Sequence, residues 1–146
     1  MPNVHKTTTL PHSAEQMFEL VNDVEKYPDF LPWCKAVHVR SRDEKKVKAT
    51  VDISKSSYKQ SFSSLLRLRK NEAVEMHLLE GPFDKFKVSW LFDPVSETQS
   101  KVTFDLDYKF SSRIVGMVAG SAIADIAETL LGFVCQRADD IYGKED

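Results

Sequence analysis

The chain has 146 residues, of which 42% are hydrophobic and 29% charged, with 5 glycines and 6 prolines. This composition excludes the disordered and fibrous classes and is typical of a globular domain. The formal net charge of −2 leaves a nucleic-acid partner open, because a near-neutral total can hide two faces of opposite charge. The length predicts one domain over residues 1–146, without a linker or an internal repeat.

Cysteine usage and the start of the chain favour a cytoplasmic location. Cys34 and Cys135 are isolated, and the N-terminus carries no basic and then apolar secretion signal. The longest apolar run, IVGMVAGSAIA at residues 114–124, is ended by Asp125 and Glu128 before it reaches the ~20 residues of a membrane span. We therefore expect a reduced, cytoplasmic protein without a transmembrane segment.

The first elements in chain order are a short strand and a helix. Residues 3–10, NVHKTTTL, are strand-like, and residues 12–23, HSAEQMFELVND, place apolar side chains at helical spacing. Ser13 is the expected N-cap, and Gln16, three residues later, completes a capping box. These signals predict a helix that begins directly after Ser13.

The next stretch, KYPDFLPWCK at residues 26–35, combines large apolar side chains with two prolines. Proline disfavours helical geometry in the residue before it, so at most one short helical turn is expected here. Phe30, Leu31 and Trp33 therefore belong to a loop, and two interpretations are open. They cap the open end of a cavity, or they fill the core between helix and sheet, as aromatic residues usually do.

Residues 36–110 alternate apolar and polar side chains with a period of two, which predicts six strands. The breaks between the strands are short and turn-like, so sequential strands should pair as an antiparallel meander with one apolar face. Gln60 and Ser64 are the strongly polar residues with inward parity. The apolar residues assigned to the inward face are Val37, Val39, Val47, Ala49, Val51, Ile53, Tyr58, Phe62, Leu66, Leu68, Val74, Met76, Leu78, Phe86, Val88, Trp90, Phe92, Val102, Phe104, Leu106, Tyr108 and Phe110.

Residues 113–142 predict one long helix or two consecutive ones. From residue 121 onward, polar residues such as Asp125, Glu128 and Asp139 occupy one side. The other side carries Ile123, Ala127, Leu130, Leu131, Val134, Ala138 and Ile141. A curved sheet needs a cover for its apolar face, and this helix is the element long enough to provide it. The predicted fold is α+β, with the sheet wrapped around the C-terminal helix.

The residues of inward parity include few side chains that could catalyse a reaction. They contain no carboxylate, lysine, arginine or histidine, so neither a metal site nor a catalytic acid or base is predicted. Asp105 and Asp107 have outward parity and are expected on a solvated face. An enzyme would have to use Tyr58 or Tyr108 for proton transfer.

Three motifs are similar to those of a known family. VNDVEKYPDFLPWC at residues 21–34, EGPFDKFKVSWLF at residues 80–92 and the helix end QRADDIYG resemble the family that holds the ribosome association toxin RatA and the mitochondrial coenzyme Q-binding proteins. That family belongs to the StAR-related lipid transfer superfamily, which also has polyketide cyclase-like members. The resemblance implies a helix-grip fold, in which a curved antiparallel sheet wraps around a long C-terminal helix and encloses an apolar cavity. It thus implies a START-like lipid- or quinone-binding domain.

The function that the resemblance implies is non-enzymatic binding of a hydrophobic ligand, most simply a ubiquinone-type prenylquinone, in support of respiration. No cofactor is required, and peripheral contact with the inner membrane is a second option for location. Three alternatives stay open: a RatA-like toxin that binds the large ribosomal subunit and blocks subunit association, a polyketide cyclase/dehydrase-type enzyme, and a filled core without a cavity. The expected ligand-binding residues are Phe30, Leu31, Trp33, Val51, Ile53, Tyr58, Phe62, Leu66, Met76, Leu78, Phe86, Trp90, Phe104, Tyr108, Met117 and Ile123.

The outward face of the sheet is expected to be basic. Parity places there Lys46, Lys48, Lys59, Arg67, Arg69, Lys85, Lys87, Lys101 and Lys109, against Asp52, Glu75, Asp105 and Asp107. Such a face can be merely solvated, or it can dock on ribosomal RNA or an anionic membrane. For docking, the expected partner-binding residues are Arg67, Arg69, Lys85 and Lys87.

Overall fold

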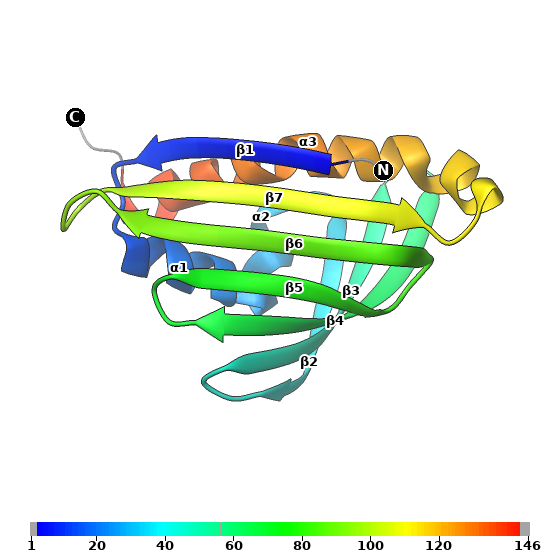
Figure 1. The fold of residues 1–146 in the computed structure, drawn as a ribbon, viewed down its shortest axis with the longest axis horizontal. Helices are drawn as coiled ribbons and strands as arrows, with labels where there is room; N and C mark the ends of the chain where they lie inside the picture. Colours follow the sequence, from blue (N-terminus) through cyan, green and yellow to red (C-terminus); the bar gives the residue numbers. More distant parts are fainter. Residues whose placement is uncertain (1–2, 56, 144–146) are drawn as a thin grey trace.

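The computed structural model describes residues 3–55 and 57–143, which form a seven-stranded sheet with helices packed on one side (Figure 1). The strands are β1 (Asn3–Leu10), β2 (Cys34–Arg42), β3 (Lys46–Lys55), β4 (Tyr58–Arg69), β5 (Ala73–Glu80), β6 (Phe83–Pro94) and β7 (Ser100–Phe110). The helices are α1 (Ala14–Asn22), α2 (Tyr27–Phe30) and α3 (Arg113–Tyr142), with a 3-10 turn, η1 (Val24–Lys26), before α2.

The strand order is β1-β7-β6-β5-β4-β3-β2, and all neighbouring strands are antiparallel. The six strands β2 to β7 therefore form the predicted meander. β1 joins this meander beside β7, with Leu10 opposite Ser100 and Asn3 opposite Asp107. Figure 1 shows the sheet curving around the long α3. The predicted α+β fold, with the sheet wrapped around the C-terminal helix, is confirmed.

The start of α1 follows its local sequence. The Gln16 backbone N–H donates to the Ser13 hydroxyl over 3.1 Å, and the Ser13 N–H donates to the Gln16 side-chain oxygen over 2.9 Å. This is the predicted capping box, which satisfies two otherwise unpaired groups at the helix start. Met17 and Val21 then bury the apolar side of α1 against the sheet.

A bulge alters the inward face at the start of β6. The residues that the sequence analysis assigned to the inward face include Phe86 but not Phe83. The pairing register with β7 shifts between Phe83 and Lys85, so both phenylalanines turn inward. The Phe83 ring packs against Phe110 and Tyr108, with ring centroids 5.1 Å and 6.2 Å apart.

α3 is one continuous helix of 30 residues. Its length and composition would suffice for a membrane span, but Ala119, Ile123, Ala127 and other side chains are buried within the described fold. Ile141, predicted on the apolar side, is 46% exposed because it lies in the last turn, at the end of the helix. Ile126, absent from the predicted apolar side, is buried.

His12, just before α1, contacts Asp139, near the end of α3. The sequence analysis placed Asp139 on the solvated side of α3, but His12 Nε2 lies 2.9 Å from its Oδ1. His12 is 1% exposed, and its ring lies against that of Tyr142, whose hydroxyl donates to the Gln16 carbonyl. These contacts fasten the end of α3 to the start of α1.

We expect the change His12→Ala to lower the free energy of unfolding by about 1–3 kcal/mol, because it leaves a partly buried carboxylate unpaired. The matched control is His5→Ala, since His5 also contacts an aspartate, Asp105, but on the exposed sheet face. That change should cost about 0–1 kcal/mol. Urea denaturation of both variants measures the difference, and equal losses would contradict a structural role for the buried contact.

Candidate apolar binding site

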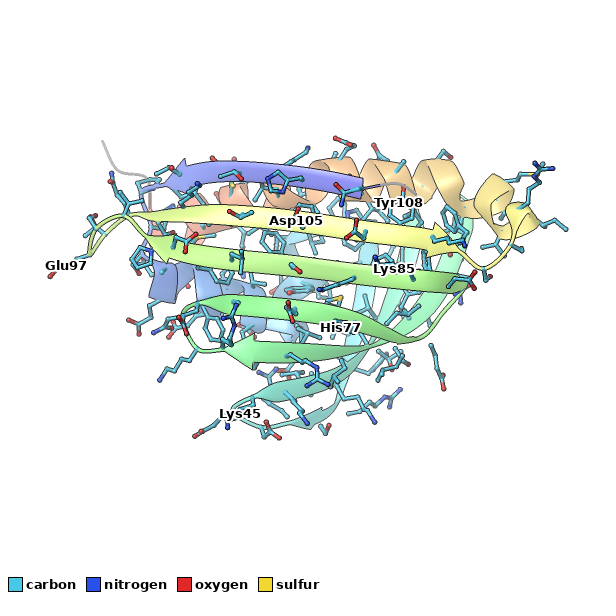
Figure 2. The ribbon with its side chains drawn as sticks, viewed as in Figure 1. Lys45, His77, Lys85, Glu97, Asp105 and Tyr108 are labelled. Carbon is cyan, nitrogen blue, oxygen red and sulfur yellow. The ribbon has the colours of Figure 1, made fainter. Side chains whose placement is uncertain are left out.

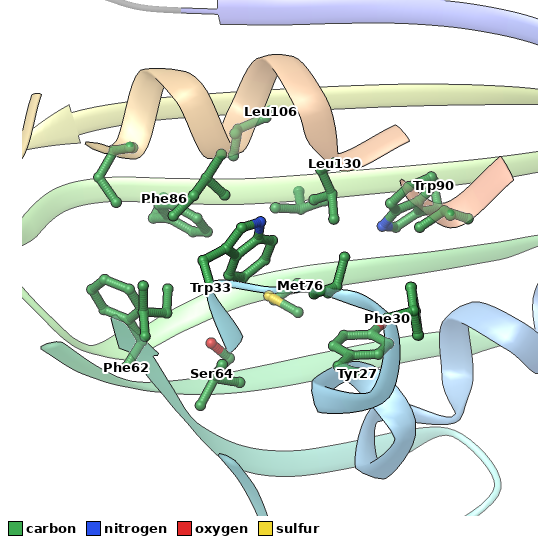
Figure 3. Close-up of a pocket in the computed structure, with 17 residues that line it drawn as sticks. Tyr27, Phe30, Trp33, Phe62, Ser64, Met76, Phe86, Trp90, Leu106 and Leu130 are labelled. Carbon is green, nitrogen blue, oxygen red and sulfur yellow. The ribbon is translucent and has the colours of Figure 1, made fainter. Parts of the chain in front are cut away.

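An apolar cavity of about 80 Å³ lies between the sheet and α3 (Figure 3). Its floor comes from β3 to β7, its roof from one side of α3, and one wall from the segment that contains α2. The lining residues are Tyr27, Phe30, Leu31, Trp33, Val51, Ile53, Phe62, Ser64, Met76, Phe86, Val88, Trp90, Leu106, Ile123, Ile126, Leu130 and Val134. The lining thus comes from elements far apart in the sequence.

Most of the expected ligand-binding residues lie around this cavity: Phe30, Leu31, Trp33, Val51, Ile53, Phe62, Met76, Phe86, Trp90 and Ile123. The strand residues among them come together because inward parity on neighbouring strands places their side chains on the same face, opposite α3. The others come from the α2 segment and from α3. The period of two in the sequence thus assigned these strand residues to the face that borders the cavity.

Five other expected residues lie in the core without lining the cavity: Tyr58, Leu66, Leu78, Phe104 and Tyr108. They share the inward parity, but the cavity occupies only part of that face and neighbouring side chains fill the rest. Met117 was also expected to bind the ligand, but it is 79% exposed and lies outside the cavity. It belongs to the first turns of α3, where Ile114 and Val118 are exposed as well.

Several lining residues were absent from the expected set: Tyr27, Ser64, Val88, Leu106, Ile126, Leu130 and Val134. Val88 and Leu106 carried the same parity signal as their neighbours. Leu130 and Val134 lay on the predicted apolar side of the helix. Ser64 is 2% exposed and has the inward parity expected of it, whereas Gln60, assigned the same parity, is half-buried and does not line the cavity.

The proline-containing segment closes one side of the cavity. Leu31 and Trp33 are 1% and 7% exposed, and the Trp33 carbonyl accepts a hydrogen bond from the Ser54 N–H over 2.9 Å. Phe30 lies under the Arg137 guanidinium, which is 5.3 Å from the ring centroid. Both interpretations of this loop therefore apply in part, because its apolar side chains belong to the core and also line the cavity.

The titratable groups near the cavity are poorly suited to catalysis. Tyr27 lines the cavity, but its hydroxyl donates to the Val21 carbonyl, and burial raises its pKa well above the usual value. Burial also raises the pKa of Tyr58 and of Tyr108, neither of which lines the cavity. Burial raises the pKa of Cys34 to about 11, so its thiol is protonated at neutral pH. Within residues 3–55 and 57–143, no carboxylate, lysine, arginine or histidine lines the cavity.

The outward face of the sheet carries the basic residues that parity placed there. Arg67, Arg69 and Lys85 are exposed and Lys87 is half-buried. Lys46 lies directly opposite Arg67, and Figure 2 shows Lys85 on the face turned away from α3. Cations on adjacent strands thus lie side by side.

Acidic residues interrupt this basic face. Glu75 lies opposite Arg67 and also 3.8 Å from Lys87. Asp107 lies opposite Lys87, and its carboxylate accepts a hydrogen bond from Asn3. Asp105 and Asp107 therefore lie on the outward face, as the sequence analysis expected, and belong to no carboxylate pair inside the cavity.

A family model and several known proteins match this chain over most of its length. Residues 10–135 match the model of the family described as polyketide cyclase / dehydrase and lipid transport. The ribosome association toxin RatA of Pseudomonas aeruginosa is 34% identical over 141 residues, covering 97% of this chain and 98% of that protein. RatA of Escherichia coli is 33% identical over 142 residues, covering 97% and 90%. A mitochondrial coenzyme Q-binding protein of Dictyostelium discoideum is 22% identical over 144 residues, covering 96% and 70%.

Solved structures extend the comparison to the fold. A START superfamily protein from Mycobacterium smegmatis superposes with a TM-score of 0.79 at 19% identity, covering 95% of this chain and 98% of that one. The aromatase/cyclase Zhui from a Streptomyces species gives a TM-score of 0.77 at 15% identity, covering 94% and 93%. At these identities the likeness concerns the fold alone, so the second structure carries no argument for cyclase chemistry.

Proposed function

The chain belongs to the polyketide cyclase / dehydrase and lipid transport family, and on this premise we propose that it is a non-enzymatic binding protein for a hydrophobic ligand. A ubiquinone-type prenylquinone is the ligand proposed, with a role in supporting ubiquinone function in respiration. The observation that carries the proposal is the cavity, whose described lining is almost entirely hydrocarbon. Such a protein would act in the cytoplasm, in peripheral contact with the inner membrane from which the ligand is taken.

Burial of the prenyl tail would supply the affinity. Each CH₂ moved out of water contributes ~0.8 kcal/mol, so a five-carbon unit contributes up to roughly 4 kcal/mol before ordering costs. The cavity of about 80 Å³ is smaller than the ~300–1,000 Å³ of usual ligand sites. Binding a whole lipid therefore requires the cavity to widen. We place this movement in the α2 segment, because it is the wall that belongs neither to the sheet nor to α3.

Mass spectrometry of an organic extract from freshly purified protein tests the proposal directly. A prenylquinone present at a substantial fraction of the protein concentration would support it. An extract without quinone or other lipid, combined with no binding of added quinone, would favour a filled core without a ligand.

We expect affinity to rise with tail length across a series of quinones that share one headgroup. The rise should amount to roughly tenfold for every two CH₂ groups, until the widened cavity is full. Isothermal titration calorimetry measures it. Flat affinity across the series would show that the tail stays outside the protein.

A second candidate function is association with the large ribosomal subunit. Two observations favour it: the RatA relatives match nearly the whole chain, and the sheet face carries Arg67, Arg69, Lys85 and Lys87. Phosphate groups of ribosomal RNA would bind such cations and release counterions. The cavity and the basic face lie on opposite sides of the sheet, so the two functions do not exclude each other.

A further inference from the structure

Among the described residues that line the cavity, Trp33 carries a buried polar group without a hydrogen-bond partner. Trp33 is 7% exposed and lines the cavity, and its indole Nε1 has no hydrogen-bond partner in the described part of the chain. An indole N–H is a donor only, and burying it unpaired costs free energy. Most buried polar groups in proteins are paired, so an unpaired one beside a cavity calls for an explanation.

The position of Trp33 relates this donor to the cavity. Figure 3 shows its ring extending into the space between Phe86, Met76 and Leu130. Trp33 lies shortly after the helix α2 and is tied to β3 through its own carbonyl, which accepts the Ser54 N–H. Ser64, on β4, adds a hydroxyl to the same lining. The cavity therefore has a small polar part among hydrocarbon walls.

We infer that Trp33 is the polar anchor of the ligand and that its indole N–H donates a hydrogen bond to an oxygen of that ligand. This inference rests on the proposed function and adds the chemical class of the ligand: an apolar molecule with a buried acceptor oxygen, such as a quinone carbonyl, as opposed to a plain hydrocarbon chain. The anchor would hold the ring of a quinone beside Trp33 and direct its tail along α3. A buried donor left unpaired selects against ligands without an acceptor.

Two matched ligands test the anchor. Trimethylhexylbenzoquinone has two carbonyls on a fully substituted ring, which does not alkylate thiols, and trimethylhexylbenzene has the same carbon skeleton without oxygen. Wild-type protein should bind the quinone about tenfold more tightly than the hydrocarbon. The change Trp33→Phe should remove most of this preference. The altered shape of the side chain should change the affinities of both ligands by a similar factor.

A second measurement follows ligand binding in the wild-type protein. The indole N–H resonances of Trp33 and Trp90 are observed by NMR and distinguished with the variant Trp90→Phe, so the result does not depend on the stability of Trp33→Phe. The Trp33 resonance should move downfield with the quinone and not with the hydrocarbon.

The outcomes separate the two proposals. If Trp33→Phe weakens both ligands equally and the Trp33 resonance responds alike to both, the residue only packs and the anchor is wrong. If the wild-type protein binds neither ligand, the proposed ligand-binding function itself fails and the anchor fails with it.

Discussion

Reversing the charges of Arg67, Arg69, Lys85 and Lys87 together to Glu should weaken binding to an anionic surface by roughly a thousandfold. Each basic residue near such a surface contributes ~1 kcal/mol, so four contribute ~4 kcal/mol, and the added carboxylates repel it further. For ribosomal RNA, the variant should also lose most of the salt dependence that counterion release produces. Sedimentation with large ribosomal subunits and with anionic vesicles measures both effects.

The control for net charge is a second quadruple variant, in which Lys26, Lys35, Lys70 and Arg113 are changed to Glu. These residues are exposed and lie elsewhere on the chain, and the two variants carry the same net charge. The control should keep most of its binding and both variants should keep the fold, because all the changed side chains point away from the core. If the first variant sediments with subunits and vesicles as well as the parent does at low salt, the basic face is only solvated surface.

The second large effect is expected from filling the cavity with Val88→Phe. Val88 lines the cavity and is 4% exposed, so a phenyl ring at this position can extend into the existing space. Ligand binding should fall by about a hundredfold or more, while the free energy of unfolding should change by less than about 1.5 kcal/mol. Calorimetric titration and thermal unfolding measure the two quantities separately.

Val102→Phe is the matched control for this change. Val102 is 0% exposed and does not line the cavity, so the same added ring meets packed side chains. Overpacking of this kind costs about 1–3 kcal/mol. Equal destabilisation by the two changes would show that the space beside Val88 cannot be used. Unchanged quinone affinity in Val88→Phe would show that the ligand binds elsewhere.

Much of the fold was predictable because it depends on local or periodic signals. The capping box at Ser13 and Gln16 involves residues three apart in the sequence, so helix formation alone brings them together. The meander could be predicted from alternation and short turns. A period of two determines which side chains of a strand point to the core, and a short turn makes consecutive strands pair with each other. The same alternation placed Val51, Phe62, Met76 and Trp90 around one cavity.

Features that depend on two distant segments were not predictable in this way. β1 gave no sign that it would pair with β7, because a strand edge accepts any extended segment of suitable register. The bulge at Phe83 shifts the alternation by one residue, and a pattern that assumes regular pairing cannot include it. His12 and Asp139 are 127 positions apart in the sequence, and each by itself is typical of a solvated surface.

For the candidate site, the sequence by itself determined its chemistry: an apolar inward face with no charged side chain of inward parity, and a basic outward face. Only the tertiary structure decided which part of that face stays unfilled. The cavity lies where the α2 segment, the sheet and the middle of α3 meet, and its size depends on how the bulky side chains of all three pack. Packing between segments is also why Met117 is exposed and why the Trp33 indole N–H finds no partner within residues 3–55 and 57–143. Polarity and period are properties of each segment alone, whereas a cavity is a property of the packing between segments.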